Sequence, residues 1–262
     1  MIPVALTIAG SDPSGGAGLQ ADLKTFHQLG VYGASVVTLV TVQNTSRFER
    51  FQALDPELVG DQLDAVLDDS PPQAAKTGAL HGPEIIRAVA ARAPRFDFPL
   101  VVDPVMVGKH GGALLNDEGR AALIAELLPR ALLVTPNLDE AAVLAGIEVT
   151  DLASMGEAAR RIARLGVAAV LVKGGHLTGE AVDLLLWEGK TRRYAAPRIQ
   201  TPGAHGTGCT YSAAITAELA RGRKLPEAVE AAKRFLTAAI RARPALGKGI
   251  GPVNHFARPE ED

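Results

Sequence analysis

The chain has 262 residues, with 27 lysines and arginines against 29 aspartates and glutamates and a formal net charge of -2. This length favours one large or two small domains, and the near-balanced charge gives no reason to expect a nucleic-acid partner. A single cysteine excludes an internal disulfide and favours the reducing cytoplasm. Because the first apolar run lacks a basic leader and no run is long enough to cross a bilayer, neither export nor a membrane partner is expected.

Short β-branched runs alternate with amphipathic helical stretches along the chain. This pattern predicts an α/β fold with a central, mostly parallel sheet covered by helices on both faces. The expected strands are residues 4–9, 34–41, 74–77, 100–103, 132–135 and 168–173. Expected helices include residues 19–29, 57–67, 84–91, 118–127 and 155–165. Pro83 suits a first helical turn, and Gly166 suits a helix stop.

The last third of the chain adds a different pattern. Residues 182–187 and 192–197 flank a short turn and are typical of a β-hairpin, which predicts antiparallel strands at one edge of the sheet. Two helices, at residues 209–222 and 226–242, follow. Because no repeat, linker or low-complexity block interrupts the sequence, a single domain over residues 1–262 is expected.

Functional side chains in such sheets gather where the strands end at their carboxyl edge. The first strand is followed by residues 10–18, which hold four glycines but lack a G-x-G-x-x-G fingerprint. This segment suits either a ligand loop or a flexible turn. After the second strand, the Gln43 amide offers a donor and an acceptor to the edge of a heterocycle. Asn44 equally suits an ordinary surface turn.

The segment after the fourth strand, residues 103–112, is rich in glycine and carries Asp103, Lys109 and His110. It predicts a mobile lid, although a plain surface loop has the same composition. Asp103 could hold a metal through water or simply open a turn before proline. Lys173 follows the sixth strand and precedes two glycines, which places a cation where a nucleotide phosphate would lie.

Asn137 and Glu140 follow the fifth strand at the spacing of a helix capping box. That spacing gives both residues a purely structural interpretation.

The chain's only cysteine lies where a glycine-containing loop turns into a helix. A helix beginning near Cys209 would leave the backbone N–H groups of Gly206, Thr207 and Gly208 free to bind an anion. The spacing from Gly203 to Gly208 resembles a P-loop, but Cys209 stands where that motif requires lysine. The helix dipole is expected to lower the thiol pKa and make Cys209 a proton acceptor. The alternative is a small buried cysteine packed as a hydrophobe.

Seven separated segments together resemble the hydroxymethylpyrimidine/phosphomethylpyrimidine kinases of thiamine biosynthesis, a ribokinase-like family. The most specific are TIAGSDPSGGAGLQADLKTF at 7–26, VVDPVM at 101–106 and HGTGCT at 205–210. QNT at 43–45, TPNL at 135–138, KGGH at 173–176 and GPVNHF at 251–256 agree. The resemblance runs nearly end to end and implies a ribokinase-like fold, a homodimer and no fused second domain.

The resemblance implies ATP-dependent phosphorylation of 4-amino-5-hydroxymethyl-2-methylpyrimidine, first to its monophosphate and then to its diphosphate. Gln43 would pair with the aminopyrimidine ring. Gly10, Ala17 and Val105 would line the ring site, and Asp22 would lie near the hydroxymethyl end. The implied partners are therefore the aminopyrimidine and ATP.

The same resemblance implies how the phosphoryl group is transferred. Cys209 would be the base at the reacting hydroxyl, and the amides of Gly206, Thr207 and Gly208 would stabilise the transferring group. Thr207 would also contact the nucleotide.

The resemblance also implies which residues bind the nucleotide and its metal ion. Asn137 and Glu140 match an N-x-x-E element that organises Mg²⁺ and the nucleotide phosphates, and Lys173 would neutralise phosphate charge. Asp103 is a second metal candidate, through water. Magnesium keeps several waters in such sites, so few protein ligands are expected.

One departure from the family pattern touches specificity. Where many relatives carry methionine, this chain has Ala79, which predicts a roomier or differently packed ring pocket. Pyridoxal and pyridoxine kinases share the fold, so a vitamin B6 kinase is the alternative function. A non-catalytic pyrimidine sensor is disfavoured, because a pure binder would need neither Cys209 nor Lys173.

Overall fold

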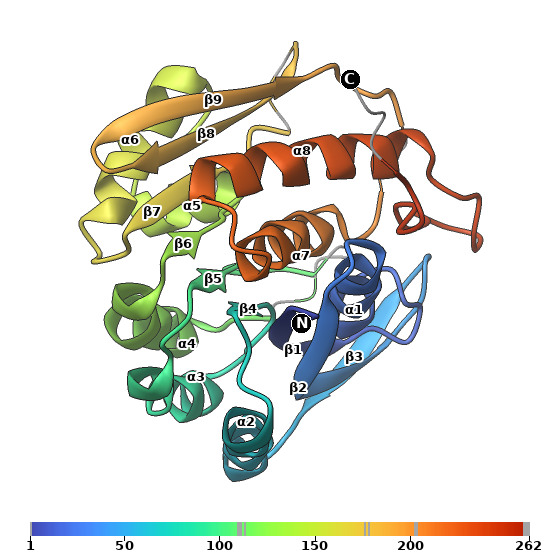
Figure 1. The fold of residues 1–262 in the computed structure, drawn as a ribbon. Coiled ribbons are helices and arrows are strands. Elements are labelled where there is room, and N and C mark those ends of the chain that lie inside the picture. The colour runs from blue at the N-terminus through green and yellow to red at the C-terminus, as the bar shows by residue number, and fades with distance from the viewer. Residues whose placement is uncertain are drawn as a thin grey trace.

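The computed structural model describes residues 2–108, 112, 114–175, 177, 179–201 and 204–258. Its strands form one nine-stranded sheet in the order β3-β2-β1-β4-β5-β6-β7-β8-β9 (Figure 1). Neighbouring strands in the middle of the sheet are parallel, as predicted. These strands are β1 (Val4–Ser11), β2 (Tyr32–Gln43), β4 (Ala74–Thr77), β5 (Leu100–Val102), β6 (Leu133–Val134) and β7 (Ala169–Val172).

Antiparallel strands close both edges of the sheet. At one edge, β8 (Ala181–Trp187) pairs with β7 and with β9 (Lys190–Ala196), which confirms the predicted hairpin. At the other edge, β3 (Phe48–Ala53) pairs with β2, and the sequence did not predict it. The segment FERFQA is short and has no β-branched residue, so its pairing with β2 rather than its own pattern holds it as a strand.

Helices cover both faces of the sheet (Figure 1). One face carries α1 (Gly18–Gln28), α7 (Thr207–Ala220) and α8 (Leu225–Arg241). The other carries α2 (Pro56–Asp69), α3 (Pro83–Ala90), α4 (Asp117–Ala122), α5 (Leu138–Ala145) and α6 (Leu152–Ala163). Among the described residues, none of these helices has the length and apolar character of a membrane span.

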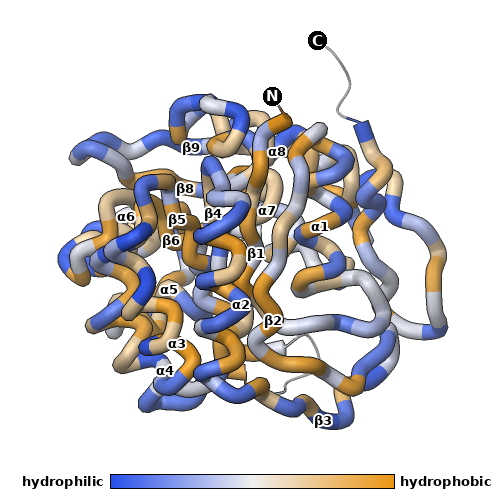
Figure 2. The backbone as a smooth tube through the Cα atoms, turned by 60° about the horizontal axis from the view of Figure 1, so that its bottom comes forward, coloured by the Kyte–Doolittle hydropathy of each residue, from blue (hydrophilic) through white to orange (hydrophobic). Residues whose placement is uncertain are grey.

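The strands contribute to two hydrophobic cores, one on each face. Along β1, Leu6 and Ile8 pack toward α2 and α3, whereas Ala5 packs toward α7 and α8. This alternation is why the central strands are apolar at nearly every position. Figure 2 shows the hydrophobic segments running through the middle of the molecule, with hydrophilic segments outside.

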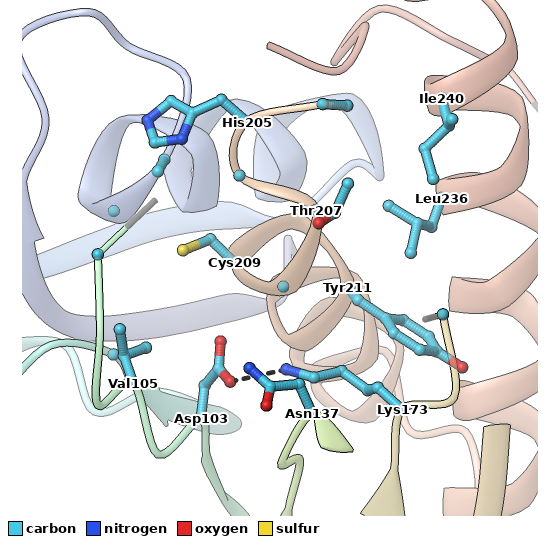
Figure 3. A pocket seen from close by; sticks show the side chains of 18 of the residues that line it. Asp103, Val105, Asn137, Lys173, His205, Thr207, Cys209, Tyr211, Leu236 and Ile240 are labelled. Atoms are coloured by element: carbon cyan, nitrogen blue, oxygen red, sulfur yellow. Dashed lines mark hydrogen bonds and ion pairs between the residues drawn. The ribbon is translucent and has the colours of Figure 1, made fainter. Parts of the chain in front are cut away.

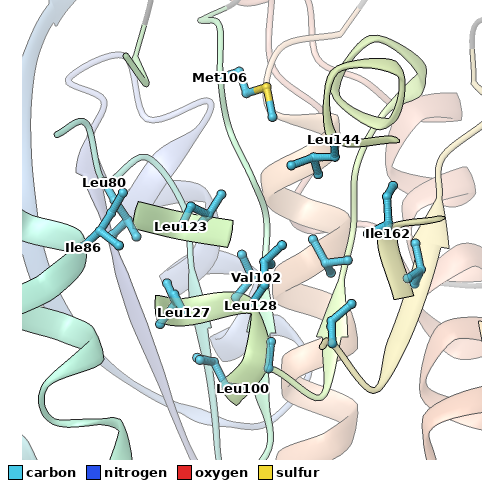
Figure 4. Close-up of a cluster of buried hydrophobic side chains, with 14 of the residues drawn as sticks. Leu80, Ile86, Leu100, Val102, Met106, Leu123, Leu127, Leu128, Leu144 and Ile162 are labelled. Atoms are coloured by element: carbon cyan, nitrogen blue, oxygen red, sulfur yellow. The ribbon is translucent and has the colours of Figure 1, made fainter. Parts of the chain in front are cut away.

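The larger core lies between the sheet and α2 to α6 (Figure 4). Leu100 and Val102 of β5 pack there with Leu127 and Leu128, all essentially unexposed. Burying each leucine contributes about 1.5–3 kcal/mol relative to leaving it in water. This packing fixes the position of β5 and of the loop that follows it.

Several boundaries differ from the sequence prediction for identifiable reasons. The helix expected at 118–127 ends as α4 at Ala122 and continues as a π-turn and a 3-10 turn up to Arg130. Pro129 lacks the N–H that a regular last turn requires. Helix α6 begins three residues early, because Asp151 and Ser154 form a capping box. Pro83 in the first turn of α3 and a left-handed Gly166 (φ 98°) are as predicted.

Candidate active site

A cavity of about 630 Å³ lies at the carboxyl ends of the parallel strands. It is bordered by the loops after β1, β5, β6 and β7, by the end of β2, and by α7 and α8. The structure brings every residue of the predicted site to this one cavity. They are Gly10, Ala17, Asp22, Gln43, Asp103, Val105, Asn137, Glu140, Lys173, Gly206, Thr207, Gly208 and Cys209.

Part of the predicted lid lies outside the described residues, namely Lys109, His110 and Gly111. His176 and Gly203 of the phosphate-side motifs lie outside them as well. At the edge of the lid segment, the Gly108 N–H donates to the Gly112 carbonyl oxygen over 2.7 Å.

The loop before α7 has the shape of an anion site. Helix α7 begins at Thr207, and its N-cap residue, Gly206, has φ 78°. A Cβ at Gly206 would lie 1.8 Å from the Gly16 carbonyl oxygen, so only glycine fits there. Among the described residues no side chain caps α7, which leaves the N–H groups of its first turn, at the cavity wall, for a ligand.

The thiol of Cys209 lies in the same first turn (Figure 3). Burial raises its pKa to about 11, even though the charge of Lys76 and the Gly18 N–H act in the opposite direction. The predicted lowering of this pKa by the helix N-terminus is therefore wrong. Removing water from around a thiolate destabilises it by more free energy than the nearby positive groups contribute to stabilising it. The thiol is therefore mostly protonated at neutral pH, and it can act as a base only in its thiolate form.

Three lysine–aspartate ion pairs line the cavity within the described part of the chain. Each joins a buried carboxylate to a lysine that is itself mostly or wholly buried. They are Lys76–Asp22 at 2.8 Å, Lys173–Asp103 at 3.0 Å and Lys233–Asp183 at 2.6 Å, between Nζ and carboxylate oxygen. Pairing of this kind is what allows charged groups to be held away from water.

The Asp22 carboxylate is wholly buried and both of its oxygens are occupied. Oδ1 accepts from Lys76 Nζ, and Oδ2 accepts from the Thr7 hydroxyl over 2.6 Å. Asp22 therefore borders the cavity as one half of a buried ion pair. A contact with an acceptor hydroxyl would have to use a remaining lone pair of these two oxygens.

The Asp103 carboxylate holds the lysine of the phosphate side in place. Oδ1 accepts from Lys173 Nζ at 3.0 Å (Figure 3). It also accepts from the Thr135 hydroxyl at 3.3 Å, and Oδ2 accepts from the Ser212 hydroxyl at 3.2 Å. Three of the roughly four lone-pair sites of this carboxylate are thus already used, which leaves at most one for direct contact with a metal ion.

Asn137 and Glu140 form the capping box that their spacing predicted. Glu140 N–H donates to Asn137 Oδ1 at 2.9 Å, and Asn137 N–H donates to Glu140 Oε2 at 2.8 Å. The structural interpretation is confirmed, yet both residues also line the cavity. Burial raises the pKa of Glu140 to about 7 against the opposing charge of Lys173. A buried carboxylate so poorly solvated is a favourable place for a cation.

Comparison with known proteins identifies the family. The Phosphomethylpyrimidine kinase family matches residues 12–254. The chain belongs to this family. A hydroxymethylpyrimidine/phosphomethylpyrimidine kinase of Rhizobium meliloti (strain 1021) is 53% identical over 262 residues, and the match covers 98% of each chain.

Two solved structures place the fold. A pyridoxal kinase of Bacillus subtilis, solved as an ADP complex, superposes with a TM-score of 0.92 at 40% identity and covers 98% of both chains. A phosphomethylpyrimidine kinase from Clostridium difficile 630 has a TM-score of 0.81 at 43% identity, over 91% of this chain and 99% of that one. The phosphomethylpyrimidine kinase family member described here therefore has the ribokinase-like fold that its motifs implied.

Other side chains show which interpretations of single residues hold. Asn44 Oδ1 accepts from the backbone N–H groups of Ser46 and Arg47, which confirms the surface-turn interpretation. Gln43 ends β2 and lines the cavity. Ala79 lines it too, and its carbonyl oxygen accepts from the Thr38 hydroxyl over 2.6 Å.

Seven charged or titratable residues in the described part of the chain border the cavity but were not predicted as site residues. They are Asp12, Lys76, Asp183, Arg198, His205, Tyr211 and Lys233. The available signal was a charged side chain inside an otherwise apolar element, such as the lysine of AAKT in β4 or the aspartate of AVDLLLW in β8. A strand buried on both faces has no solvent for such a charge, which indicates a specific partner.

Proposed function

We propose that this chain phosphorylates 4-amino-5-hydroxymethyl-2-methylpyrimidine and then its monophosphate, with ATP as donor. The observation that carries this is one cavity that joins an amide-bearing ring site, a thiol and an uncapped helix N-terminus. The Rhizobium meliloti relative, similar over nearly the whole chain, bears a name for the same two activities. The product serves thiamine diphosphate biosynthesis.

On the acceptor side, Gln43 pairs with the aminopyrimidine, and Gly10, Ala17 and Val105 bound the ring. Gly10 lies in β1, where a Cβ would come 2.5 Å from the Leu39 side chain of the neighbouring strand β2, so a larger side chain has no room there. Asp22 lies near the hydroxymethyl group, where its carboxylate is held by the hydrogen bond from Lys76.

On the chemical step, the thiolate form of Cys209 accepts the proton of the hydroxyl as the oxygen attacks the γ-phosphorus and ADP leaves. The N–H groups of Gly206, Thr207 and Gly208 stabilise charge on the transferring phosphoryl group. A Cβ at Gly208 would lie 3.3 Å from Lys173 Nζ, so that ammonium sits beside the same turn.

On the donor side, Asn137, Lys173 and Thr207 contact the nucleotide, and Glu140 and Asp103 hold Mg²⁺. Among the described residues, no three His, Cys, Asp or Glu side chains gather into a metal centre. Glu140 and Asp103 suit an ion that arrives on nucleotide phosphates and keeps its waters. When bound, the ion would neutralise charge on the phosphates.

The assignment is tested by supplying Mg²⁺-ATP with hydroxymethylpyrimidine, its monophosphate or pyridoxal, each separately, and resolving the products by chromatography. Turnover of both pyrimidines is the expected result. Binding of the pyrimidines without any product would instead support a sensor.

Vitamin B6 kinase activity is the second candidate. It is favoured by the superposition on the Bacillus subtilis pyridoxal kinase and by the small side chain of Ala79 at the cavity wall. Turnover of pyridoxal alone in the same assay would establish it. An Ala79→Met variant, which narrows the ring pocket, is then expected to lose pyridoxal turnover first.

The remaining proposals concern the protein as a whole. The chain acts in the cytoplasm as one kinase domain over residues 1–262 and forms a homodimer, with small-molecule ligands and neither nucleic acid nor membrane as partners. Light scattering of the purified chain tests the dimer.

The affinity for Mg²⁺-ATP is expected to fall as the pH drops below about 7. Burial raises the pKa of Glu140 to about 7, and only its carboxylate form can hold a cation. Below that pH, metal binding must displace a proton, so KM for Mg²⁺-ATP should rise by up to about tenfold per pH unit. Initial rates between pH 6 and 8.5 measure this.

The matched variant for this profile is Glu140→Gln, whose amide oxygen can still cap α5. It should have a high KM that no longer changes between pH 6 and 8.5. A wild-type KM that is flat across this range would contradict the role of Glu140.

A further inference from the structure

Two glycine-rich loops from opposite ends of the chain touch at the cavity. One is the loop between β1 and α1, and the other is the loop that leads into α7. A Cβ at Gly16 would lie 2.7 Å from the ring of His205, and a Cβ at Gly206 would overlap the Gly16 carbonyl oxygen. The acceptor loop and the anion loop are therefore packed backbone to backbone.

One buried carboxylate joins these loops. Asp12 Oδ2 accepts from His205 Nε2 at 2.9 Å and from the N–H groups of Gly16 and Ala17 at 3.1 and 2.9 Å. Its other oxygen accepts from the N–H and hydroxyl of Ser14. Both Asp12 and His205 border the cavity, and their side chains are almost wholly buried.

The protonation of this contact follows from its partners. Although burial opposes it, the hydrogen bonds from His205 and Ser14 lower the pKa of Asp12. Asp12 is therefore a carboxylate that can only accept, so Nε2 of His205 carries the proton and donates. The backbone N–H of His205 donates to the Gly251 carbonyl oxygen over 2.9 Å, which connects the loop to the C-terminal segment.

We propose that Asp12 and His205 are positioning residues that align the anion loop with the bound acceptor. The inference rests on the proposed phosphoryl transfer. His205 directly precedes Gly206, the N-cap of α7, so moving the imidazole moves the N–H groups that face the phosphoryl group. Asp12 likewise sets the course of residues 16–18, which pass beside the ring site.

The consequence is a coupling between the two loops that is felt mainly in the transition state. Hydrogen-bond donors aimed at developing charge lose most of their effect when displaced by about 1 Å. A ground-state nucleotide, held also by Asn137 and Lys173, depends less on that alignment.

The test uses the full chain with His205→Ala, His205→Gln, Asp12→Asn and the double variant Asp12→Asn/His205→Ala. For each, kcat and KM are measured with whichever acceptor the wild type turns over. Affinity for ADP with fluoroaluminate plus acceptor, which mimics the transferring phosphoryl group, is compared with affinity for AMP-PCP. Unfolding is followed by circular dichroism so that rates refer to folded protein.

The expected result is a loss of about 10- to 100-fold in kcat for His205→Ala and for Asp12→Asn. Fluoroaluminate affinity should fall in parallel, while AMP-PCP affinity changes less than about threefold. The double variant should be no worse than either single one, because both break the same contact. His205→Gln, whose amide nitrogen can take the place of Nε2, should recover most of the rate.

Ser14→Ala is the matched control, since it removes hydrogen bonds to Asp12 but leaves the His205 contact. Its kcat should stay within about twofold of wild type. Wild-type kcat in folded His205→Ala, or equal losses of fluoroaluminate and AMP-PCP affinity, would overturn the inference. A wild-type chain that phosphorylates no acceptor would refute the proposed function, and the inference would fall with it.

Discussion

Replacing Cys209 by alanine should nearly abolish transfer to hydroxymethylpyrimidine and affect transfer to its monophosphate far less. A neutral alcohol must lose its proton as it attacks, and a positioned base is worth about 10²- to 10⁴-fold there. The phosphate acceptor is already an anion and mainly needs positioning and charge neutralisation. We therefore expect kcat/KM to fall by at least about 10²-fold for the first acceptor and by less than about tenfold for the second.

The two transfers are measured separately on the same preparation, each acceptor being supplied alone with Mg²⁺-ATP. Thr216→Ala is the control, because it lies two turns farther along α7, where its hydroxyl donates to the Ser212 carbonyl oxygen and does not border the cavity. That variant should keep both rates. Equal losses in both transfers with Cys209→Ala would remove the thiol from the proton step and leave it only a packing role.

The course of the central strands could be predicted because each carries its own apolar pattern. The carboxyl-end rule then placed Gln43, Asp103 and Lys173 near one another without any knowledge of their contacts. Strand β3 could not be found in this way, because its pairing with β2 is not a property of the segment FERFQA itself.

Charges with distant partners were equally hard to predict. The three lysine–aspartate pairs of the cavity join residues 54, 70 and 50 positions apart. From the sequence, Asp103 suggested a metal ligand or a turn, and its bond to Lys173 appears only once β5 and β7 are placed in one sheet.

The thiol pKa shows how burial overrides a local rule. The start of α7 alone predicts a lowered pKa for Cys209, since helix N-termini favour thiolates. The fold surrounds that turn with the acceptor loop and α1, and exclusion of water reverses the direction of the shift. The position of the thiol at a helix start was predicted correctly, but the larger effect on its pKa came from burial, which only the complete fold shows.

Lys76→Met should be among the most destabilising single substitutions in this protein. Lys76 and Asp22 are both fully buried, so removal of the ammonium leaves an unpaired carboxylate in the interior. Breaking a buried pair in this way costs about 3–5 kcal/mol of unfolding free energy, which urea titration would measure. Lys76→Met combined with Asp22→Asn removes both charges and should recover most of that loss. Equal stability of the single and double variants would contradict the pairing.

The single substitutions Lys76→Met and Asp22→Asn should shift the pKa of the Cys209 thiol in opposite directions. Lys76 lowers the pKa of Cys209 and Asp22 raises it, so Lys76→Met should shift it upward from about 11 and Asp22→Asn downward. Because Cys209 is the only cysteine, thiolate absorbance and the pH dependence of alkylation report on this one group. If neither variant shifts the pKa of Cys209, Lys76 contributes only to the stability of the fold. If both move it as expected, the buried pair beneath the acceptor also sets the proton affinity of the base, and its charge balance becomes part of the first transfer.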